Sequence, residues 1–300
     1  MKIAGKTAVL TGASGGIGKF IARALAREGA TVVSVSRSPS ELAEICAEVE
    51  TWGGKGIAIP FDLSQLAELP TLVEKIEQQT GTVDILINNA AIEKFLPFQE
   101  YVLEDILGML NINLQAPMEL ARLLLPGMLE RDRGHIVNIS SGSGKKGAPY
   151  NSIYSASKAG LIMWADSLGQ ELADTNVGVS VICPGYTNAG MYHALKITAP
   201  DAADVAEPTV VADAVIRAIV QNRKEIVIDG LTAKIFSALI QVFPQWGDKI
   251  LKQVGALELN RSCAQKQMAA QFRKDVSRSR SVSEGNNSPT ITIDKSISTN

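Results

Sequence analysis

The chain has 300 residues, 46% of them hydrophobic and 20% charged, so it is long enough to bury a large core. Its formal net charge of -2 gives no sign of a nucleic-acid-binding surface. Three widely spaced cysteines and only two histidines argue against a disulfide framework, a metal site and most histidine-based catalysis. The odd number of widely spaced cysteines favours a reducing compartment, and we expect a cytoplasmic protein.

Short apolar strands alternate with helical patterns along most of the chain. Strands are predicted at 7–10, 31–35, 56–61, 83–87, 136–139, 177–182 and 225–228. Helices are predicted near 17–29, 38–52, 66–79, 103–130, 152–173 and 210–220, and the 103–130 pattern is compatible with two helices that meet near Asn113. Strands that are apolar on both faces are typical of a parallel sheet covered by helices. We therefore predict an α/β fold: a doubly wound, Rossmann-type, mostly parallel seven-stranded sheet with helices on both faces.

The predicted catalytic domain is a single unit over residues 1–256. Within it, the irregular segment 186–208 is predicted to form a lid over the substrate. Residues 257–300 form a C-terminal tail. From about 277 the tail is rich in serine and charge and lacks large apolar residues, so we predict disorder there.

Residues 231–254 form an amphipathic segment, which Pro244 splits into two predicted helices. Its apolar face could pack on the domain or across a subunit interface. Alternatively, it could rest on a membrane surface with Phe243 and Trp246 inserted, which would place the protein at the membrane periphery. No run of apolar residues approaches the roughly 18 that a transmembrane helix requires.

A glycine-rich turn links the first predicted strand to the first helix. Gly12, Gly16 and Gly18 would let backbone N–H groups approach a pyrophosphate at the positive end of the helix, and Ser14 and Ile17 lie in the same turn. The position of this turn, after the first strand of an alternating chain, is typical of dinucleotide binding.

The same turn also satisfies the G-x-S-x-G pattern of a serine hydrolase, with Ser14 as the nucleophile. We keep this hydrolase as an alternative. Two features argue against it: the turn lies on the first strand, before any oxyanion loop, and only His193 follows it at a plausible position. His135, just before a predicted strand, is expected at the surface.

Arg37 lies about twenty residues beyond the glycine turn, at the end of the second predicted strand. An acidic residue at this position would accept a hydrogen bond from a ribose 2′-hydroxyl, whereas an arginine suits a 2′-phosphate. We therefore expect NADP(H) rather than NAD(H).

Tyr154 and Lys158 stand four residues apart on one predicted helix, so their side chains project from the same face. A neighbouring ammonium favours the phenolate, so Lys158 is expected to lower the pKa of Tyr154. Ser141 ends the preceding strand, where its hydroxyl can reach the same pocket. Taken alone, the pair is better explained by an ordinary helix than by a catalytic site. The other motifs of the chain favour the catalytic site.

In these residues the sequence resembles the short-chain dehydrogenase/reductase family, over residues 5 to about 230. The residues that match in order and at family spacing are T11-G-x-x-x-G-x-G18, Asp62, N88-N-A90, Asn113, Ser141, Tyr154-x-x-x-Lys158 and Pro184-Gly185. The chain departs from the family at Ala91, where glycine is commoner, and at Ala189, where threonine is frequent.

The resemblance implies a role for each of four residues, called the tetrad below. Tyr154 would be the general acid/base, and Lys158 would lower its pKa and bind the nicotinamide ribose. Ser141 would orient the substrate carbonyl. Asn113 would hold a water molecule that relays protons to Lys158.

The resemblance also implies a set of cofactor contacts beyond the glycine turn. Asp62, with Leu63 next to it, would accept a hydrogen bond from the adenine amino group. Asn89 and Ala90 would line the cofactor cleft, and Pro184 and Gly185 would lie beside the nicotinamide. Asn88 is assigned to structure alone.

The predicted function is NADP(H)-dependent interconversion of a carbonyl and an alcohol on a small molecule. Apolar side chains in the predicted lid favour an apolar or lipid-like substrate: Met191, Tyr192, Leu195 and Ile197. A non-catalytic dinucleotide-binding scaffold is a further alternative, which an intact tetrad disfavours. We expect a homodimer or homotetramer.

Overall fold

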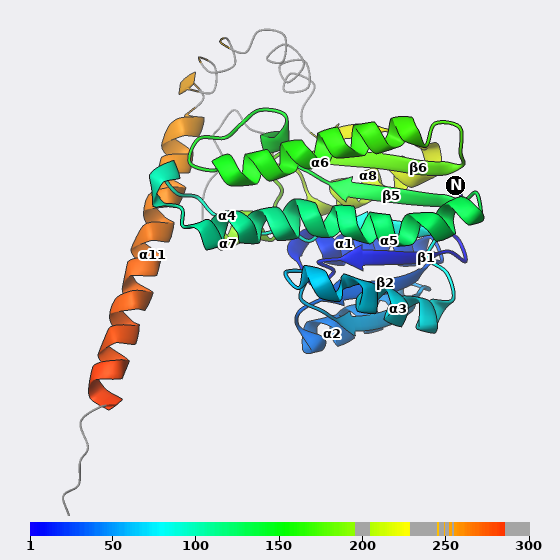
Figure 1. Ribbon diagram of the computed structural model, residues 1–300, viewed down its shortest axis with the longest axis horizontal. Helices are drawn as coiled ribbons and strands as arrows, with labels where there is room; N and C mark the ends of the chain where they lie inside the picture. The colour runs from blue at the N-terminus through cyan, green and yellow to red at the C-terminus, as the bar shows by residue number, and fades with distance from the viewer. Residues whose placement is uncertain (196–204, 229–244, 246–248, 250–251, 254, 286–300) are drawn as a thin grey trace, which may run out of the picture.

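The computed structural model describes residues 1–195, 205–228, 245, 249, 252–253 and 255–285. Its centre is a seven-stranded sheet in the order β3-β2-β1-β4-β5-β6-β7, in which every neighbouring pair is parallel (Figure 1). The strands are β1 (Thr7–Thr11), β2 (Thr31–Ser36), β3 (Lys55–Pro60), β4 (Ile85–Asn88), β5 (Gly134–Ile139), β6 (Val177–Pro184) and β7 (Glu225–Ile228). The predicted doubly wound fold is confirmed. The strand order reverses between β1 and β4, where this kind of sheet opens a crevice for a ligand.

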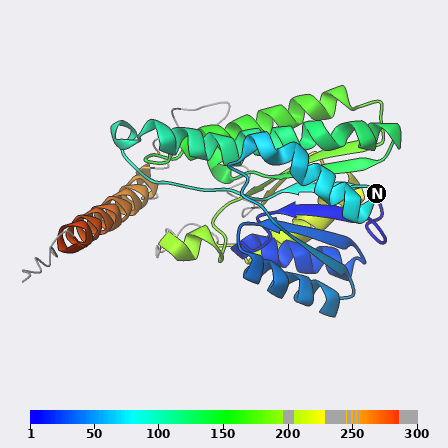
Figure 2. The same cartoon turned by 60° about the horizontal axis from the view of Figure 1, so that its bottom comes forward.

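Helices cover both faces of the sheet (Figure 2). One core lies under α1 (Gly16–Arg27), α2 (Pro39–Thr51) and α8 (Pro208–Gln221), and the other under α3 (Leu69–Thr80), α5 (Ala116–Glu130) and α6 (Ser152–Glu171). The remaining described elements are α4 (Leu103–Leu110), α7 (Met191–Leu195), α11 (Ala256–Gly285), the 3₁₀ turns η1 (Leu66–Glu68), η2 (Phe98–Glu100) and η4 (Gly142–Gly144), and the π-turn η3 (Asn111–Gln115).

Alternating side chains of β1 supply both cores. Ala8 and Leu10 pack toward α1 and α8, whereas Val9 packs toward α3 and α5. Successive side chains of a strand point to opposite faces, so a buried strand must be apolar at every position. This explains why the strands are continuous apolar runs.

His135 is buried, and the prediction that it lies at the surface is wrong. β5 begins at Gly134, two residues before the predicted start, so His135 lies inside the strand between Ile85 and Gly178, with 2% of its surface exposed. Its Nε2 lies 2.8 Å from Ser180 Oγ, and burial lowers its pKa to about 4. A neutral imidazole that shares one hydrogen bond fits this core without an uncompensated charge.

The tail is helical where the sequence analysis predicts disorder from about 277, because α11 continues to Gly285. Alanine, glutamine, lysine and arginine are frequent along α11 and favour helix even without a core to cover. The beginning of the helix is anchored, since Cys263 and Ala264 are buried against Phe95. Figures 1 and 2 show the rest of α11 extending away from the sheet.

The predicted amphipathic segment 231–254 lies outside the described residues except at 245, 249 and 252–253. Both interpretations of its apolar face therefore stay predictions. The predicted lid over 186–208 also stays a prediction, since 196–204 lie outside the described residues. In the part of the chain that the structure describes, every helix is too short or too polar to cross a bilayer.

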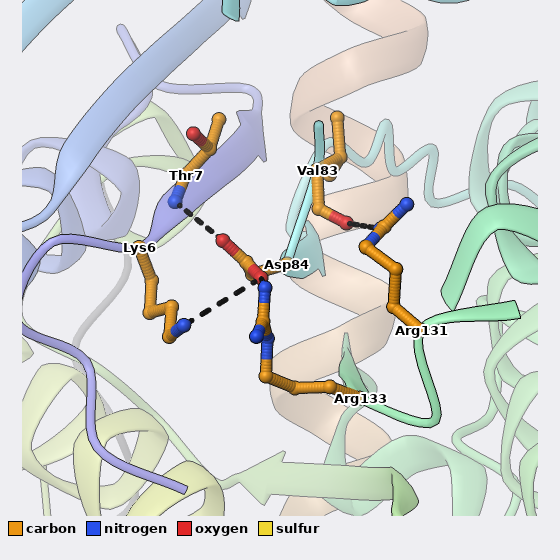
Figure 3. A network of polar contacts seen from close by, with 6 residues as sticks. All are labelled: Lys6, Thr7, Val83, Asp84, Arg131 and Arg133. Atoms are coloured by element: carbon orange, nitrogen blue, oxygen red, sulfur yellow. Dashed lines mark hydrogen bonds and ion pairs between the residues drawn. The ribbon is translucent and has the colours of Figure 1, made fainter. Parts of the chain in front are cut away.

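The amino ends of β1, β4 and β5 meet at a buried carboxylate (Figure 3). Asp84, 4% exposed, accepts hydrogen bonds from the backbone N–H of Thr7 at 3.1 Å and from Nε of Arg133 at 3.0 Å. Lys6 Nζ lies 4.0 Å away. Arg131 donates to the neighbouring carbonyl oxygen of Val83 at 3.0 Å. This network lies at the edge of the sheet opposite the glycine turn.

Removal of the carboxylate in Asp84→Ala should destabilise the fold by about 2 kcal/mol, because a charged acceptor of two hydrogen bonds is lost and Arg133 is only partly solvated. Urea unfolding followed by circular dichroism measures the difference. Asp213→Ala on the exposed side of α8 is the matched control and should unfold with the parent. Equal midpoints for Asp84→Ala and the control would contradict the structural role.

Candidate functional site

In the glycine turn after β1, positions 12 and 18 have no room for a side chain. Gly12 has φ +63°, and a Cβ on it would lie 2.8 Å from Ala90 Cα. A Cβ on Gly18 would lie 2.2 Å from the carbonyl oxygen of Gly12. The N-cap of α1, Gly15, supplies no side-chain cap, and the first turn of α1 has no acidic residue. Backbone N–H groups at this helix start are therefore suited to an anion, as a dinucleotide pyrophosphate requires.

The end of β4 is tied directly to this turn. The Asn89 side chain donates from Nδ2 to the carbonyl oxygens of Thr11 and Gly12, both at 3.0 Å. The backbone N–H groups of Asn89 and Ala90 donate to Thr11 Oγ1 at 3.0 and 3.1 Å. Asn88 donates instead to Asn138 Oδ1 at 2.9 Å, inside the sheet. Asn89 and Ala90 thus lie at the crevice, and Asn88 lies in the core.

Two residues predicted at the adenine end of the cofactor lie close together. Arg37 is exposed at the end of β2, and Asp62 follows β3. The pKa of Asp62 is lowered by a hydrogen bond from the backbone N–H of Ser64 and by the positive charge of Arg37. Leu63, next to Asp62, is buried. The arrangement places a cation and an acceptor beside the glycine turn.

Tyr154 and Lys158 are both buried on α6, and Lys158 is only 2% exposed. Nζ of Lys158 donates to the carbonyl oxygen of Ile139 at 2.8 Å and lies 5.6 Å from the centre of the Tyr154 ring. Ser141, just beyond β5, lies close enough to the Tyr154 phenol to lower its pKa, and its Oγ accepts from the backbone N–H of Ser143 at 3.1 Å. The structure therefore brings these three tetrad residues together.

Asn113 is fully buried in the π-turn between α4 and α5. Its Oδ1 accepts from the backbone N–H of Ile92, and its Nδ2 donates to the Ile92 carbonyl oxygen, both at 2.9 Å. Nδ2 also donates to Ser157 Oγ at 3.1 Å. A single π-turn inside a helix is frequent at functional sites. Here it connects the helix pair to the loop after β4 and to α6.

The short chain dehydrogenase family matches residues 6–199, in the part of the chain that forms this site. The chain belongs to that family. It is 48% identical over 270 residues to the ketoacyl reductase HetN of Nostoc sp. (strain PCC 7120), covering 88% of this chain and 94% of the relative. It is 33% identical over 203 residues to the 3-oxoacyl-[acyl-carrier-protein] reductase FabG of Thermotoga maritima, covering 68% of this chain and 82% of the relative.

A solved structure supports the same assignment. A metagenomic short-chain oxidoreductase in complex with NADP has a TM-score of 0.66 and 32% identity, covering 76% of this chain and 98% of that chain. This dehydrogenase/reductase is thus an oxidoreductase for carbonyl/alcohol interconversion that uses a nicotinamide dinucleotide.

The pKa of Tyr154 in this short-chain dehydrogenase/reductase is raised above its ordinary value. That Lys158 lowers it stays a prediction. Burial raises it most, the negative charge of Glu93 raises it further, and the hydrogen bond from Ser141 lowers it. A buried phenolate has lost its hydration, and the nearby ammonium is itself bonded to a carbonyl oxygen. Burial likewise lowers the pKa of Lys158 to about 8.

Glu93 is the ionisable residue of this site that the sequence analysis missed. It is partly buried in the loop that follows β4 and lies close enough to affect both Tyr154 and Lys158 electrostatically. A signal was present in the sequence, since Glu93 follows N88-N-A-A91 at the carboxyl end of a central strand. Isolated glutamates in loops are usually solvated, so this pattern alone does not predict a buried site residue.

The loop after β6 lies against the glycine turn. The backbone N–H of Gly185 donates to the Ile228 carbonyl oxygen at 3.1 Å, which fixes Pro184 and Gly185 at the end of the strand. A Cβ on Gly16 would lie 2.2 Å from Gly190 N. Buried Ala189 therefore lies beside the turn, at the place where the family often has threonine.

The structure gives no support to the serine hydrolase. Both histidines of the chain lie in described residues: His135 is bonded to Ser180, and His193 Nε2 lies 2.7 Å from Asn188 Oδ1. Neither is a partner of Ser14. Within the described ranges, histidine, cysteine and acidic side chains form no group of three that could bind a metal ion.

Proposed function

We propose that the protein is an NADP(H)-dependent dehydrogenase/reductase that interconverts a carbonyl and an alcohol on an apolar or lipid-like substrate. The observation that supports it most is the convergence of the Tyr154 phenol, the Ser141 hydroxyl and the Lys158 ammonium at the carboxyl edge of the sheet. A scaffold that only bound a dinucleotide would have no need of this arrangement.

The cofactor supplies the hydride when it is bound, and the chain supplies the proton and the geometry. In the reduction, the Tyr154 phenol donates its proton to the carbonyl oxygen as that oxygen gains charge. The raised pKa of Tyr154 keeps the phenol protonated at neutral pH, as this step requires. Ser141 donates a hydrogen bond to the same oxygen. Lys158 supplies a positive charge beside the phenol. Asn113 fixes the Ile92 backbone through two hydrogen bonds.

Arg37 supports NADP(H) as the cofactor, as does the NADP in the related oxidoreductase structure. The contact of a guanidinium with a 2′-phosphate contributes about 1.5–3 kcal/mol, which is roughly a ten- to hundred-fold preference for NADPH over NADH. Arg37→Ala should lose this preference and leave the affinity for NADH nearly unchanged. Titration of nucleotide fluorescence measures both affinities.

Arg217→Ala is the control for this experiment, because Arg217 is an exposed arginine on α8 that belongs to neither the glycine turn nor the end of β2. It should keep the preference of the parent. If the parent protein itself binds NADPH and NADH equally, Arg37 has no role at the 2′-position.

An apolar substrate is supported by the surroundings of Tyr154, which packs in one buried cluster with Leu96, Tyr101, Met109 and Ile153. Two relatives are named as ketoacyl and 3-oxoacyl reductases, so a keto group on an acyl chain is the substrate class that we propose. Ketones and 3-oxoacyl thioesters of increasing chain length, each assayed with NADPH and NADH, test it. Absence of nucleotide oxidation with every carbonyl compound would refute the proposal.

The remaining features of the proposal concern the chain as a whole. They are a single catalytic domain over residues 1–256, a homodimeric or homotetrameric assembly, and a cytoplasmic location. Peripheral membrane contact through 231–254 would suit a lipid-like substrate.

A further inference from the structure

Glu93 is held in place by the residues on both sides of the site. The preceding residue, Ile92, is bonded through both its N–H and its carbonyl oxygen to the Asn113 side chain at 2.9 Å. Two residues later, the N–H of Phe95 donates to Gln267 Oε1 of α11 at 2.7 Å. The segment that contains Glu93 is therefore fixed between a tetrad residue and the C-terminal helix.

The partner of Glu93 is Asn151, which lies directly before α6, one turn ahead of Tyr154. Asn151 is 1% exposed, and its Nδ2 donates to Glu93 Oε1 at 2.5 Å. An asparagine at this position normally caps the helix by accepting a backbone N–H. Here the side chain makes no cap, and its Oδ1 has no hydrogen-bond partner in the described part of the chain. The missing helix cap and the unpaired Oδ1 both cost stability. The hydrogen bond from Asn151 to Glu93 is therefore not explained by stabilisation of α6.

The charge of Glu93 acts on both reacting groups of the tetrad in the same direction. It raises the pKa of Lys158, against the effect of burial, because a carboxylate stabilises the ammonium. It also raises the pKa of Tyr154, because a carboxylate opposes a phenolate. Burial raises the pKa of Glu93 itself to about 7, and Asn151 and Lys158 oppose that shift.

Three other ionisable groups around Glu93, each from a different part of the chain, are neutral near pH 7. Burial raises the pKa of Tyr101 and of Tyr186 to about 12, and it also raises the pKa of the Cys263 thiol. The adjacent Lys94 is paired with Asp105 at 2.6 Å. Lys158 is therefore the cation that responds most directly to the Glu93 charge.

We propose that Glu93, bonded to Asn151 at the start of α6 and adjacent to the contact between Ile92 and Asn113, is a positioning residue of the acid/base site whose negative charge acts on Lys158 and Tyr154. The proposal rests on the proposed function of the tetrad. Above about pH 7 the Glu93 carboxylate is charged and favours the phenol, the form that reduction needs. Below that pH the carboxyl group becomes neutral and its effect on both groups is lost.

The first experiment measures the coupling without cofactor or substrate. In protein labelled with ¹³C at the glutamate carboxyls, the resonance that disappears in Glu93→Gln identifies Glu93. It should titrate near pH 7. In Lys158→Met the midpoint of the Glu93 carboxyl titration should rise by about one pH unit, because the Lys158 ammonium no longer favours the carboxylate. A midpoint below pH 5 in the parent, or one that Lys158→Met leaves unchanged, would overturn the proposal.

The second experiment follows the pH dependence of kcat/KM for alcohol oxidation. Glu93→Gln keeps an acceptor for Asn151 but removes the charge, so the rising limb should shift by about one unit toward lower pH. Glu93→Asp keeps the charge, so its pH profile should lie closer to that of the parent than the profile of Glu93→Gln does. Glu100→Gln removes an exposed charge from η2 and is the control. Superimposable profiles for Glu93→Gln and the parent would refute the role.

The two experiments separate this inference from the proposed function. If no carbonyl substrate is turned over, the proposed function fails, but the carboxyl titration still decides whether Glu93 and Lys158 are coupled. If turnover is found and the titration shows no coupling, only the role of Glu93 is refuted.

Discussion

Turnover should fall about 10²–10⁴-fold in Tyr154→Phe, the usual effect of removing one acid/base group. The ring that packs with Leu96, Met109 and Ile153 is kept, so the buried cluster should persist. What is lost is the phenol hydroxyl, the group that donates the proton. Single-turnover reduction under saturating nucleotide measures the effect on the chemical step.

Nucleotide binding is the control for this variant, because the glycine turn and Arg37 are unchanged. Tyr154→Phe should bind NADPH with an affinity close to that of the parent. If it binds the nucleotide normally and still turns over within a few-fold of the parent, Tyr154 is not the proton donor.

Gly18→Ala should abolish most nucleotide binding, because the new Cβ would lie 2.2 Å from the Gly12 carbonyl oxygen and 2.8 Å from that of Ala13. Neither backbone atom can move without opening the turn. Overpacking of this kind costs about 1–3 kcal/mol or more, so we expect at least a roughly tenfold loss of nucleotide affinity together with a lower unfolding midpoint.

Gly169→Ala on α6 is the matched control, since its Cβ would make an ordinary contact of 3.7 Å with Val179. It should bind nucleotide like the parent and gain about 0.5–1 kcal/mol of stability, because alanine favours helix. Fluorescence titration and urea unfolding of both variants decide the matter. Normal nucleotide affinity in Gly18→Ala would mean that the turn is not the phosphate site.

Much of the site could be predicted because its residues lie at the ends of strands or one turn apart on a helix. The positions of Gly12, Ser141 and Asn89 follow from where β1, β5 and β4 end, and strand ends are visible as breaks in apolar runs. The spacing of Tyr154 and Lys158 follows from helix geometry alone. Parallel strands then bring these ends to one edge of the sheet.

The parts that could not be predicted depend on contacts between distant segments or on burial. Glu93 and Asn151 are 58 residues apart and meet only in the fold. The direction of the Tyr154 pKa depends on burial, whereas the spacing of two residues shows only their mutual charge effect. The burial of His135 escapes prediction for a similar reason, since β5 begins two residues before the predicted start and so moves His135 from the surface into the core.

The C-terminal helix has a consequence for how related enzymes can diverge. α11 lies beyond residue 199, where the family match ends, yet Gln267 accepts from the Phe95 N–H and Arg261 Nε donates to the Tyr150 hydroxyl at 2.9 Å. Those contacts hold the two loops from which Glu93 and Asn151 project. If Glu93 acts as proposed, mutations in α11 are expected to alter the working pH while every family motif stays intact. Homologues with identical motifs but different C-terminal helices need not have inherited the same working pH.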